Sequence, residues 1–282
     1  MNIIVGATGQ IGSNLISEVK KYGAPVRAVV RNPEKLKDKS IEFREADLFD
    51  SDQLREAFED GTTVFVITPE SQTSNDIIGD TRRIVENYRK AVEQTGIQKV
   101  VGLSCVGAHV DGNTGNILMS RILEQGFDGL NARKIFVRPS YYFSNWLGYL
   151  DTIERYGILP TFFPEDLDIE MNSPIDVAKI IAKVIVEEDA FGDEDVIELT
   201  GQQRYNPRDV ANIFSMTHNK PVNLQVISHI KWRETLRSVG FSENTAANLV
   251  GMTQAVIDNI AVPEHPGKVI KLPTTLEDYL FR

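Results

Sequence analysis

The sequence predicts an α/β protein with a doubly wound parallel sheet and a smaller C-terminal α/β lobe. Short β-branched apolar runs alternate with amphipathic helical patterns through the first half of the chain, which is the pattern of repeated β-α units. A glycine-rich turn separates the first apolar run from the first helical pattern. After Pro139 the alternation loosens, and this indicates a lobe built differently from the main sheet.

The first half is predicted to alternate strictly between strands and helices. The run from Thr62 to Thr68 is nearly all apolar, as expected for a parallel strand that is buried on both faces. Helices are predicted from Ile11 to about Gly23, after a cap at Ser51, from Ile77 to about Gly96, and over residues 115–125. The predicted strands are Ile3–Val5, Val26–Val30, Ile41–Phe43, Thr62–Thr68, Lys99–Ser104 and Lys134–Arg138.

The second half contains further helix and strand signals without a clear linker. Ser173-Pro174 and Asn206-Pro207 each place a capping residue before a proline, which predicts a helix N-terminus. The segments VIELTG and PVNLQVIS predict strands, and TTLEDYL predicts a capped final turn. We therefore expect a dinucleotide-binding domain over residues 1–150 and a smaller substrate or partner lobe over residues 151–282, with some of its segments returning to the main sheet.

Composition excludes several classes of function. The 282 residues carry a formal net charge of −10, so we expect no direct nucleic-acid binding, which requires a basic surface. The single cysteine, Cys105, cannot form an internal disulfide, the N-terminus has no signal-peptide pattern, and no apolar run is long enough to span a bilayer. A cytoplasmic location without membrane contact is expected. The four histidines have no metal-ligand spacing, so no metal site is predicted.

The turn GATGQIG has the composition of a phosphate-binding loop. Gly6 is expected to allow the tight turn, Gly9 to let the backbone approach a pyrophosphate, and Gly12 to let the helix pack closely on the strand. Thr8 adds a hydroxyl donor. The N-terminus of a helix attracts anions, and here the first N–H groups are those of Gln10, Ile11 and Gly12.

Charged residues near the next two strands indicate which dinucleotide binds. An NAD-binding protein usually places a carboxylate after the second strand, whereas this chain has Arg31 there and Lys35 four residues on. A guanidinium pairs well with a phosphate, so NADP(H) is favoured over NAD(H). Asp47, after the third strand, could accept a hydrogen bond from the adenine amine or simply belong to a turn.

Two further segments follow predicted strands at the carboxyl edge of the sheet, where ligands of such sheets bind. Thr68-Pro69 follows the fourth strand, and Ser104 follows the fifth. These residues are therefore candidates for the nicotinamide end of the site, although Ser104 could also be an ordinary residue at a strand end.

Several motifs together resemble the NmrA-like branch of the atypical short-chain dehydrogenases/reductases. They are GATGQIG, RNPEKL, ADLFD, KVVGLSCVGA and VRPSYYFSNW, with NSPIDVAKIIAKVI, DVIELTG and KWRETLRSVGF in the second half. The resemblance covers nearly the whole chain. It implies a Rossmann domain, a smaller C-terminal lobe, a substrate cleft between them, and a preference for NADP(H).

The resemblance also implies which residues contact the cofactor. The pyrophosphate lies at the glycine turn, the 2′-phosphate at Arg31 and Lys35, the adenine at Asp47, and the nicotinamide half at Thr68-Pro69 and along the segment from Tyr142 to Asn145. Within that segment, the expected contacts of the cofactor are Tyr142, Phe143 and Asn145. Leu48 and Ser104 are further expected contacts of the cofactor.

The chain lacks the Tyr-x-x-x-Lys pair with which active short-chain dehydrogenases transfer a proton. The segment GNTGNILMSRILEQG contains neither tyrosine nor lysine and offers Asn116, Ser120 and Arg121 instead. Tyr142 and Ser104 are the remaining candidate catalytic groups. Tyr141 is a weaker candidate that could equally pack under the lobe, and Cys105 is expected to be a buried apolar residue rather than a redox thiol.

Two functions remain open, and a third is disfavoured. The first is an NADPH-dependent reductase of a small quinone or carbonyl substrate bound between the lobes. The second is a redox sensor that binds NADP(H) and a partner protein without catalysis. A nucleotide-sugar epimerase would need the missing tyrosine and lysine. The protein is expected to be a monomer or a homodimer.

Overall fold

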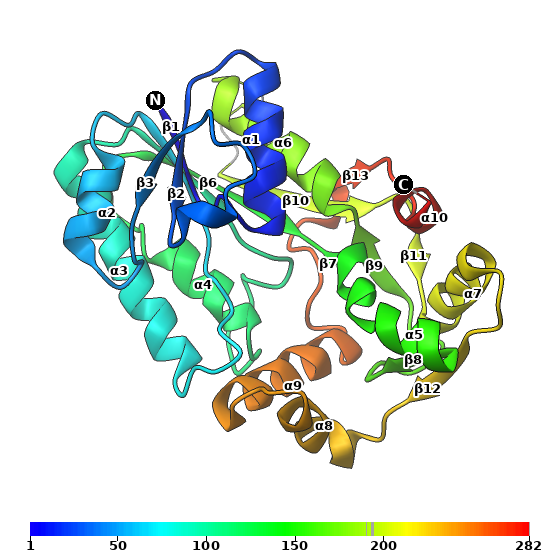
Figure 1. Ribbon diagram of the computed structural model, residues 1–282. Helices are drawn as coiled ribbons and strands as arrows, with labels where there is room; N and C mark the ends of the chain where they lie inside the picture. The colour runs from blue at the N-terminus through cyan, green and yellow to red at the C-terminus, as the bar shows by residue number, and fades with distance from the viewer. Residues whose placement is uncertain (190, 193–194, 282) are drawn as a thin grey trace.

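The main sheet of the computed structural model has eight parallel strands in the order β13-β10-β6-β5-β4-β1-β2-β3 (Figure 1). The structure describes residues 1–189, 191–192 and 195–281. This is the doubly wound Rossmann-type fold that the sequence predicts. The strands are β1 (Asn2–Val5), β2 (Val26–Val30), β3 (Glu42–Glu45), β4 (Thr63–Val66), β5 (Lys99–Leu103), β6 (Arg133–Pro139), β10 (Val196–Gly201) and β13 (Ile270–Leu272).

Strand order reverses direction between β1 and β4. Strand β1 pairs with β2 on one side and with β4 on the other, so that Ile4 lies opposite both Ala28 and Phe65. Chain connections leave the sheet in opposite senses from this point, which opens a crevice at the carboxyl ends of the strands. The glycine turn that follows β1 therefore lies at the switch point of the sheet.

Helices cover both faces of the sheet (Figure 1). Alternate residues of the central strands face opposite ways: Ile4 and Phe65 belong to the core beneath α1 and α6, whereas Ile3 and Val64 belong to the core beneath α2, α3 and α4. All four side chains are fully buried. The helices are α1 (Gln10–Lys21), α2 (Ser51–Phe58), α3 (Ile77–Thr95), α4 (Ile117–Gln125) and α6 (Pro174–Val186).

A smaller lobe with its own apolar core lies beside the carboxyl edge of the main sheet (Figure 1). Its strands form a three-stranded sheet of order β11-β9-β7 and a parallel pair of β12 with β8. Trp146 and Phe214 are among its fully buried side chains. Its elements are β7 (Tyr141–Tyr142), η2 (Phe143–Tyr149), α5 (Leu150–Tyr156), β8 (Ile158–Thr161), β9 (Ile169–Asn172), β11 (Arg204–Tyr205), α7 (Pro207–His218), β12 (Asn223–Val226) and α10 (Leu276–Leu280).

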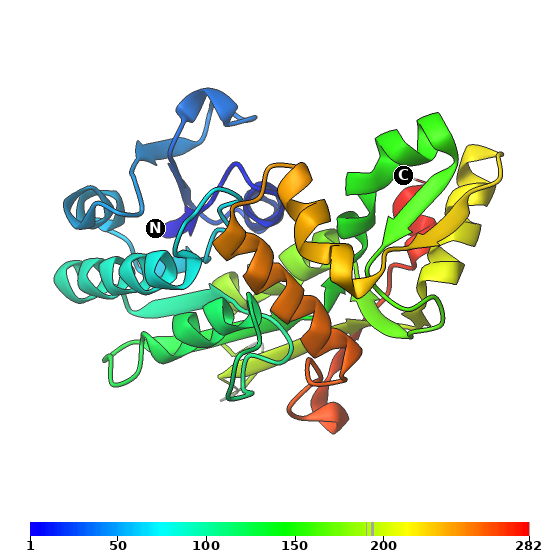
Figure 2. The same cartoon turned by 90° about the horizontal axis from the view of Figure 1, so that it is seen from below.

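Helices α8 (Trp232–Ser238) and α9 (Glu243–Ile257) cross between the two parts of the molecule (Figure 2). The start of α9 is bound to the segment that follows β4: the Ser242 backbone donates to the Gln72 carbonyl, and the Thr245 hydroxyl donates to the Ser71 carbonyl. Two short helices, η3 (His229–Lys231) and η4 (Pro266–Lys268), flank this pair along the chain. Helix α9 thus holds the 71–74 segment in a fixed position.

Most local predictions are confirmed, and two details were wrong. Ser173 and Asn206 cap α6 and α7 as expected. Helix α2, however, is capped by Asp50, whose carboxylate accepts from two backbone N–H groups, and Ser51 is its first residue. The predicted third strand, Ile41–Phe43, runs instead over Glu42–Glu45. The division of the chain at residue 150 stays a prediction, and strands β10 and β13 from the second half lie in the main sheet.

None of the helices in the described part of the chain combines the length and the apolar character needed to cross a bilayer. Among the same residues, no group of three or more histidine, cysteine or acidic side chains is arranged to hold a metal ion.

Candidate cofactor and substrate site

The glycine turn after β1 has the geometry that the sequence predicts. Gly6 adopts a φ of +68° and accepts a hydrogen bond of 2.9 Å from the Gly9 backbone. A Cβ on Gly12 would lie 2.3 Å from the Gly6 carbonyl oxygen and 2.9 Å from the Ala7 Cα. These are backbone atoms, so only glycine lets α1 begin this close to the turn.

The N-terminus of α1 has no cap from a side chain. Its N-cap residue is Gly9, which makes no side-chain hydrogen bond, and its first turn contains no acidic residue. Helices α2 and α3, in contrast, are capped by the carboxylates of Asp50 and Asp76. The first N–H groups of a helix attract anions. The start of α1, with the exposed Thr8 before it, therefore fits a pyrophosphate.

The segment after β6 also reaches the start of α1, which the sequence did not indicate. The Ser144 hydroxyl in η2 donates to the Gln10 side-chain oxygen at 3.0 Å. The two residues are 134 positions apart in the chain, so no local sequence pattern could predict the contact. It places η2 beside the glycine turn.

Arg31 and Lys35 lie where the sequence placed them, but they are not the only cations there. Both side chains are exposed on the segment after β2, where η1 (Pro33–Lys35) is capped by the Asn32 side chain. A cleft of about 290 Å³ beside α1 is lined by Lys20 and Lys37, among other residues. Lys20 is paired with Asp38. Sequence reasoning missed Lys37.

The residues expected at the adenine are held by local hydrogen bonds. One carboxylate oxygen of the exposed Asp47 accepts from the Phe49 backbone at 3.0 Å, and its backbone N–H donates to the Gln53 side chain. The carbonyl of Leu48 accepts from Asn87. Asp47 thus belongs to a local turn, which was one of its two predicted roles. Its contact with adenine stays a prediction.

Ser104, the strand-end candidate for catalysis, is part of a buried ionic network. Its hydroxyl donates to the Glu124 carboxylate, and only 5% of its surface is exposed. Glu124 in turn accepts two hydrogen bonds from the Arg138 guanidinium, at 2.8 and 2.7 Å. A hydroxyl that is already donating to a carboxylate is poorly placed to donate to a substrate.

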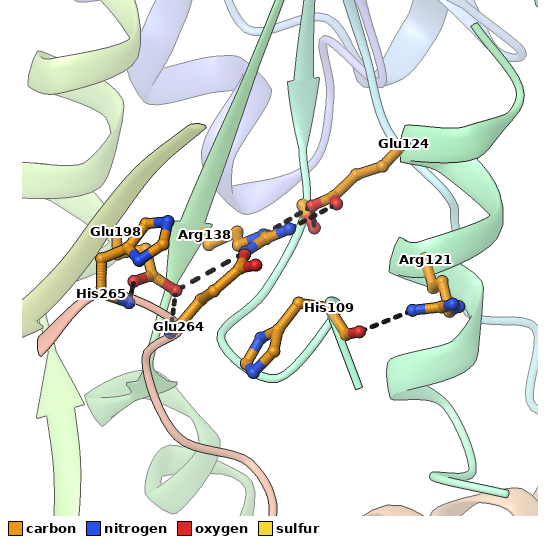
Figure 3. Close-up of polar contacts among 8 residues, drawn as sticks. His109, Arg121, Glu124, Arg138, Glu198, Glu264 and His265 are labelled. Atoms are coloured by element: carbon orange, nitrogen blue, oxygen red, sulfur yellow. Dashed lines mark hydrogen bonds and ion pairs between the residues drawn. The ribbon is translucent and has the colours of Figure 1, made fainter. Parts of the chain in front are cut away.

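Arg138 is surrounded by three carboxylates from distant parts of the chain (Figure 3). Besides Glu124, it contacts Glu264 at 2.6 Å and Glu198 at 3.7 Å, and Glu198 itself accepts from the backbones of Glu264 and His265. Burial alone would lower the pKa of Arg138, but the hydrogen bonds that its guanidinium donates to the Glu124 and Glu264 carboxylates raise that pKa above its usual range. This network fastens the 264–265 loop to the sheet.

The aromatic segment after β6 divides between the site and the core of the lobe. Phe143, expected to contact the cofactor, is fully buried against Tyr205 and Tyr279, so its side chain cannot line the site. Tyr141 packs against Trp146 and Phe163, as the packing alternative proposed. Burial raises the pKa of Tyr141 well above its ordinary value.

Tyr142 has a buried hydroxyl without a hydrogen-bond partner within the described chain. Burial is the main cause that raises its pKa far above the ordinary value of a phenol, and Cys105 lies near enough to add to it. The Cys105 thiol is half-buried, and burial raises its pKa to about 11. Both groups therefore stay protonated at neutral pH. Asn145, the last of the expected contacts, is exposed.

Glu70, after the end of β4, and Asn116, at the start of α4, are neighbours that the sequence did not bring together. Asn116 is 4% exposed, and neither its side-chain nitrogen nor its oxygen has a partner within hydrogen-bonding distance in the described residues. Glu70 follows Thr68-Pro69, and its carboxyl lies beside the Asn116 amide. Arg121, in contrast, is engaged elsewhere, by Asp111 and the His109 carbonyl (Figure 3).

Comparison with known proteins agrees with this geometry. Residues 6–134 match the model of a family described as NAD(P)H-binding, which confirms the expected class of cofactor. An NAD(P)H azoreductase from Xenophilus azovorans is 24% identical over 253 residues, which cover 87% of this chain and 84% of that protein.

Solved structures share the fold over the whole chain. An NADPH-dependent quinone oxidoreductase from Escherichia coli, crystallised with NADPH, is 22% identical, with a TM-score of 0.76 over 100% of this chain and 99% of that one. The triphenylmethane reductase of a Citrobacter species, complexed with NADP(H), is also 22% identical, with a TM-score of 0.80 over the same shares. Residues 6–134 of the chain thus match an NAD(P)H-binding family, and the chain shares its Rossmann-type fold with proteins named as oxidoreductases.

Proposed function

We propose that this protein is an NADPH-dependent reductase of the NmrA-like branch of the atypical short-chain dehydrogenases/reductases, acting on a small quinone, azo compound or carbonyl. The observation that carries the proposal is the pairing of two features at one edge of the sheet. One is the uncapped start of α1 at Gly9, and the other is the set of buried, unpartnered polar atoms of Asn116 and Tyr142. Buried polar atoms without partners are rare in native proteins, and a ligand would satisfy them.

The residues present fit such a cofactor. The glycine turn and the first N–H groups of α1 would hold the pyrophosphate, and the exposed Arg31 and Lys35 would pair with the 2′-phosphate. Thr68, Pro69 and Asn145 would lie along the nicotinamide half. When bound, the reduced nicotinamide supplies a hydride to the substrate. The protein contributes orientation, exclusion of water and a proton.

The reductase accounts for the buried, unpartnered polar atoms of Asn116 and Tyr142 better than the alternatives. A sensor that only binds nucleotide does not need polar groups for a substrate beside the nicotinamide. An epimerase would require the tyrosine and lysine that the chain lacks. The names of the azoreductase and quinone oxidoreductase relatives favour conjugated acceptors that accept a hydride and a proton.

Steady-state oxidation of NADPH tests the proposal. Purified protein is assayed with a panel of quinones, azo dyes and enones, with NADH in parallel, while NADPH affinity is measured separately by fluorescence. Turnover of at least one acceptor, with NADPH preferred over NADH, is expected. Tight NADPH binding without any turnover would contradict the reductase and favour the sensor.

A further inference from the structure

We propose that the carboxyl group of Glu70 donates the proton in this reduction and that the Asn116 amide stabilises the carboxylate that remains. The inference rests on the proposed function and assigns the step for which the chain lacks the usual tyrosine and lysine. It is based on the place of Glu70 at the end of β4, the anchoring of its segment by α9, and the unpartnered amide beside it.

Glu70 lies on the strand next to the cofactor turn. It is four residues beyond the end of β4, and β4 pairs directly with β1, which leads into Gly6. A dinucleotide bound at the switch point passes over these two strand ends. The side chain is exposed to solvent in the absence of ligand, so a substrate beside the nicotinamide can reach it.

The segment that carries Glu70 is held firmly from the C-terminal half. Ser242 and Thr245 of the α9 N-terminus bind the carbonyls of residues 71, 72 and 74, and the Asn244 side chain accepts from the Ile77 backbone at 2.9 Å. A catalytic acid needs this kind of support, since misplacement by about 1 Å costs roughly a hundredfold in rate.

Asn116 is fixed by the same helix. Its backbone N–H donates to the Asn248 carbonyl at 3.3 Å, and Gly115 packs so closely that a Cβ there would lie 2.0 Å from that same oxygen. The Asn116 amide forms no hydrogen bond to Glu70 in the described structure, but it lies near enough to the carboxyl to favour its ionised form. It is therefore placed to stabilise the carboxylate that remains after the proton has left.

The surroundings keep Glu70 protonated to a higher pH than an ordinary glutamate. Glu70 is accessible to solvent, but the many protein atoms around its carboxyl partly desolvate it and raise its pKa, and the neighbouring Asn116 lowers that pKa by less. The charge of Glu70 raises the pKa of two nearby groups, Cys105 after β5 and Tyr141 in β7. Both groups are protonated, and therefore uncharged, at neutral pH. The acidic groups that follow it are engaged: Asp76 caps α3, Asp80 accepts from Ser74, and Glu243 of α9 is paired with Arg233 and Arg237.

The other candidate donors are less suited. The Ser104 hydroxyl already donates to Glu124. Burial raises the pKa of the Tyr142 phenol and of the Cys105 thiol, so both are poor proton donors at neutral pH. The best general acid has a pKa near the working pH. Among these groups, Glu70 is the one whose pKa is moved toward neutrality.

The step is balanced with the reduced nicotinamide as the source of two electrons. With NADPH bound, a quinone would receive two electrons as a hydride, which leaves NADP⁺; the O–H bond of Glu70 would break, and its proton would join a quinone oxygen to complete the hydroquinone. The carboxylate of Glu70 then recovers a proton from water. A cationic triphenylmethane dye differs, because the addition of hydride alone gives its neutral leuco form and no proton is required.

This difference provides a direct test. Glu70→Gln keeps the shape of the side chain and removes the acid, so kcat with a quinone should fall by about a hundredfold to ten-thousandfold, and kcat with a cationic dye should change less than about threefold. The quinone rate of the wild type should decline as pH rises through the pKa of Glu70, and that decline should vanish in the variant. Glu56→Gln, at a position whose side chain is 65% exposed on α2, is the matched control and should behave as wild type.

A second readout needs no turnover. Carbon-13 NMR of labelled glutamate carboxyls in the unliganded protein should show one resonance that titrates above the ordinary glutamate pKa and is missing in Glu70→Gln. An ordinary titration, a quinone rate unaffected by the substitution, or an equal loss with quinone and dye would overturn the inference while leaving the reductase intact. Failure of the wild type to reduce any acceptor would overturn the proposed function and this inference with it.

Discussion

Replacing Gly12 should damage the cofactor turn more than it damages the fold. A Cβ at this position would lie 2.3 Å from the Gly6 oxygen and 2.8 Å from the Gly6 carbonyl carbon, whereas ordinary contacts are 3.4–4 Å. The turn or the helix must therefore move by about 1 Å in Gly12→Val. Overpacking of this kind costs about 1–3 kcal/mol, which corresponds to a decrease in Tm of roughly 2–12 °C.

The loss of cofactor binding should be larger than the loss of stability. NADPH at about a hundred times its Kd stabilises a protein that binds it by about 2.7 kcal/mol. Thermal unfolding of the wild type should therefore shift upward with NADPH, and that shift should disappear in Gly12→Val because the displaced turn no longer presents its N–H groups. Gly267→Val is the control, since a Cβ there meets nothing within 4 Å. A Gly12→Val protein with the full NADPH-induced shift would refute the assignment of the turn.

Three further predictions follow from charged and polar groups. Arg31→Ala should weaken NADPH binding by about 10- to 100-fold and NADH binding hardly at all. If fluorescence titrations give an unchanged ratio of the Kd values for NADPH and NADH, Arg31 does not bind the 2′-phosphate. Arg138→Ala should lose about 3–5 kcal/mol of unfolding free energy, because Glu124 and Glu198 stay buried without their partner. Arg138 lowers the pKa of Glu264, so the loss, measured by urea unfolding, should grow as pH rises and the Glu264 carboxyl ionises. Asn116→Ala should raise the pKa of Glu70 and so shift the fall of kcat to higher pH, and a fall at lower pH would contradict the arrangement.

The sequence predicts those parts of the fold that depend on neighbouring residues. The tight turn at Gly6, the proline-started helices at Pro174 and Pro207, and the alternation of strands and helices all follow from local geometry and periodicity. The cap of α2 was assigned one residue late, because Asp50 and Ser51 are both good N-caps and only the backbone conformation distinguishes them.

At the phosphate end of the candidate site the glycine turn has the predicted backbone geometry, and its binding of a pyrophosphate stays a prediction. The glycine turn carries its chemistry in one short segment. The Arg138 network, in contrast, joins residues up to 126 positions apart, and the contact of Glu70 with Asn116 depends on how α9 positions both loops. Phe143 was assigned to the cofactor because its segment lies at the right edge, but its side chain turns into the core of the lobe.

The participation of β10 and β13 in the main sheet has a consequence for synthesis of the chain. Until residue 201 has left the ribosome, β6 lacks its neighbour on one side, and the apolar face of α1 that packs on α6 lacks its cover until residue 186 has emerged. An open strand edge beside an apolar surface is prone to aggregation. A fragment ending at residue 150 would lack β10 and α6, so the edge of β6 and the apolar face of α1 would both stay uncovered.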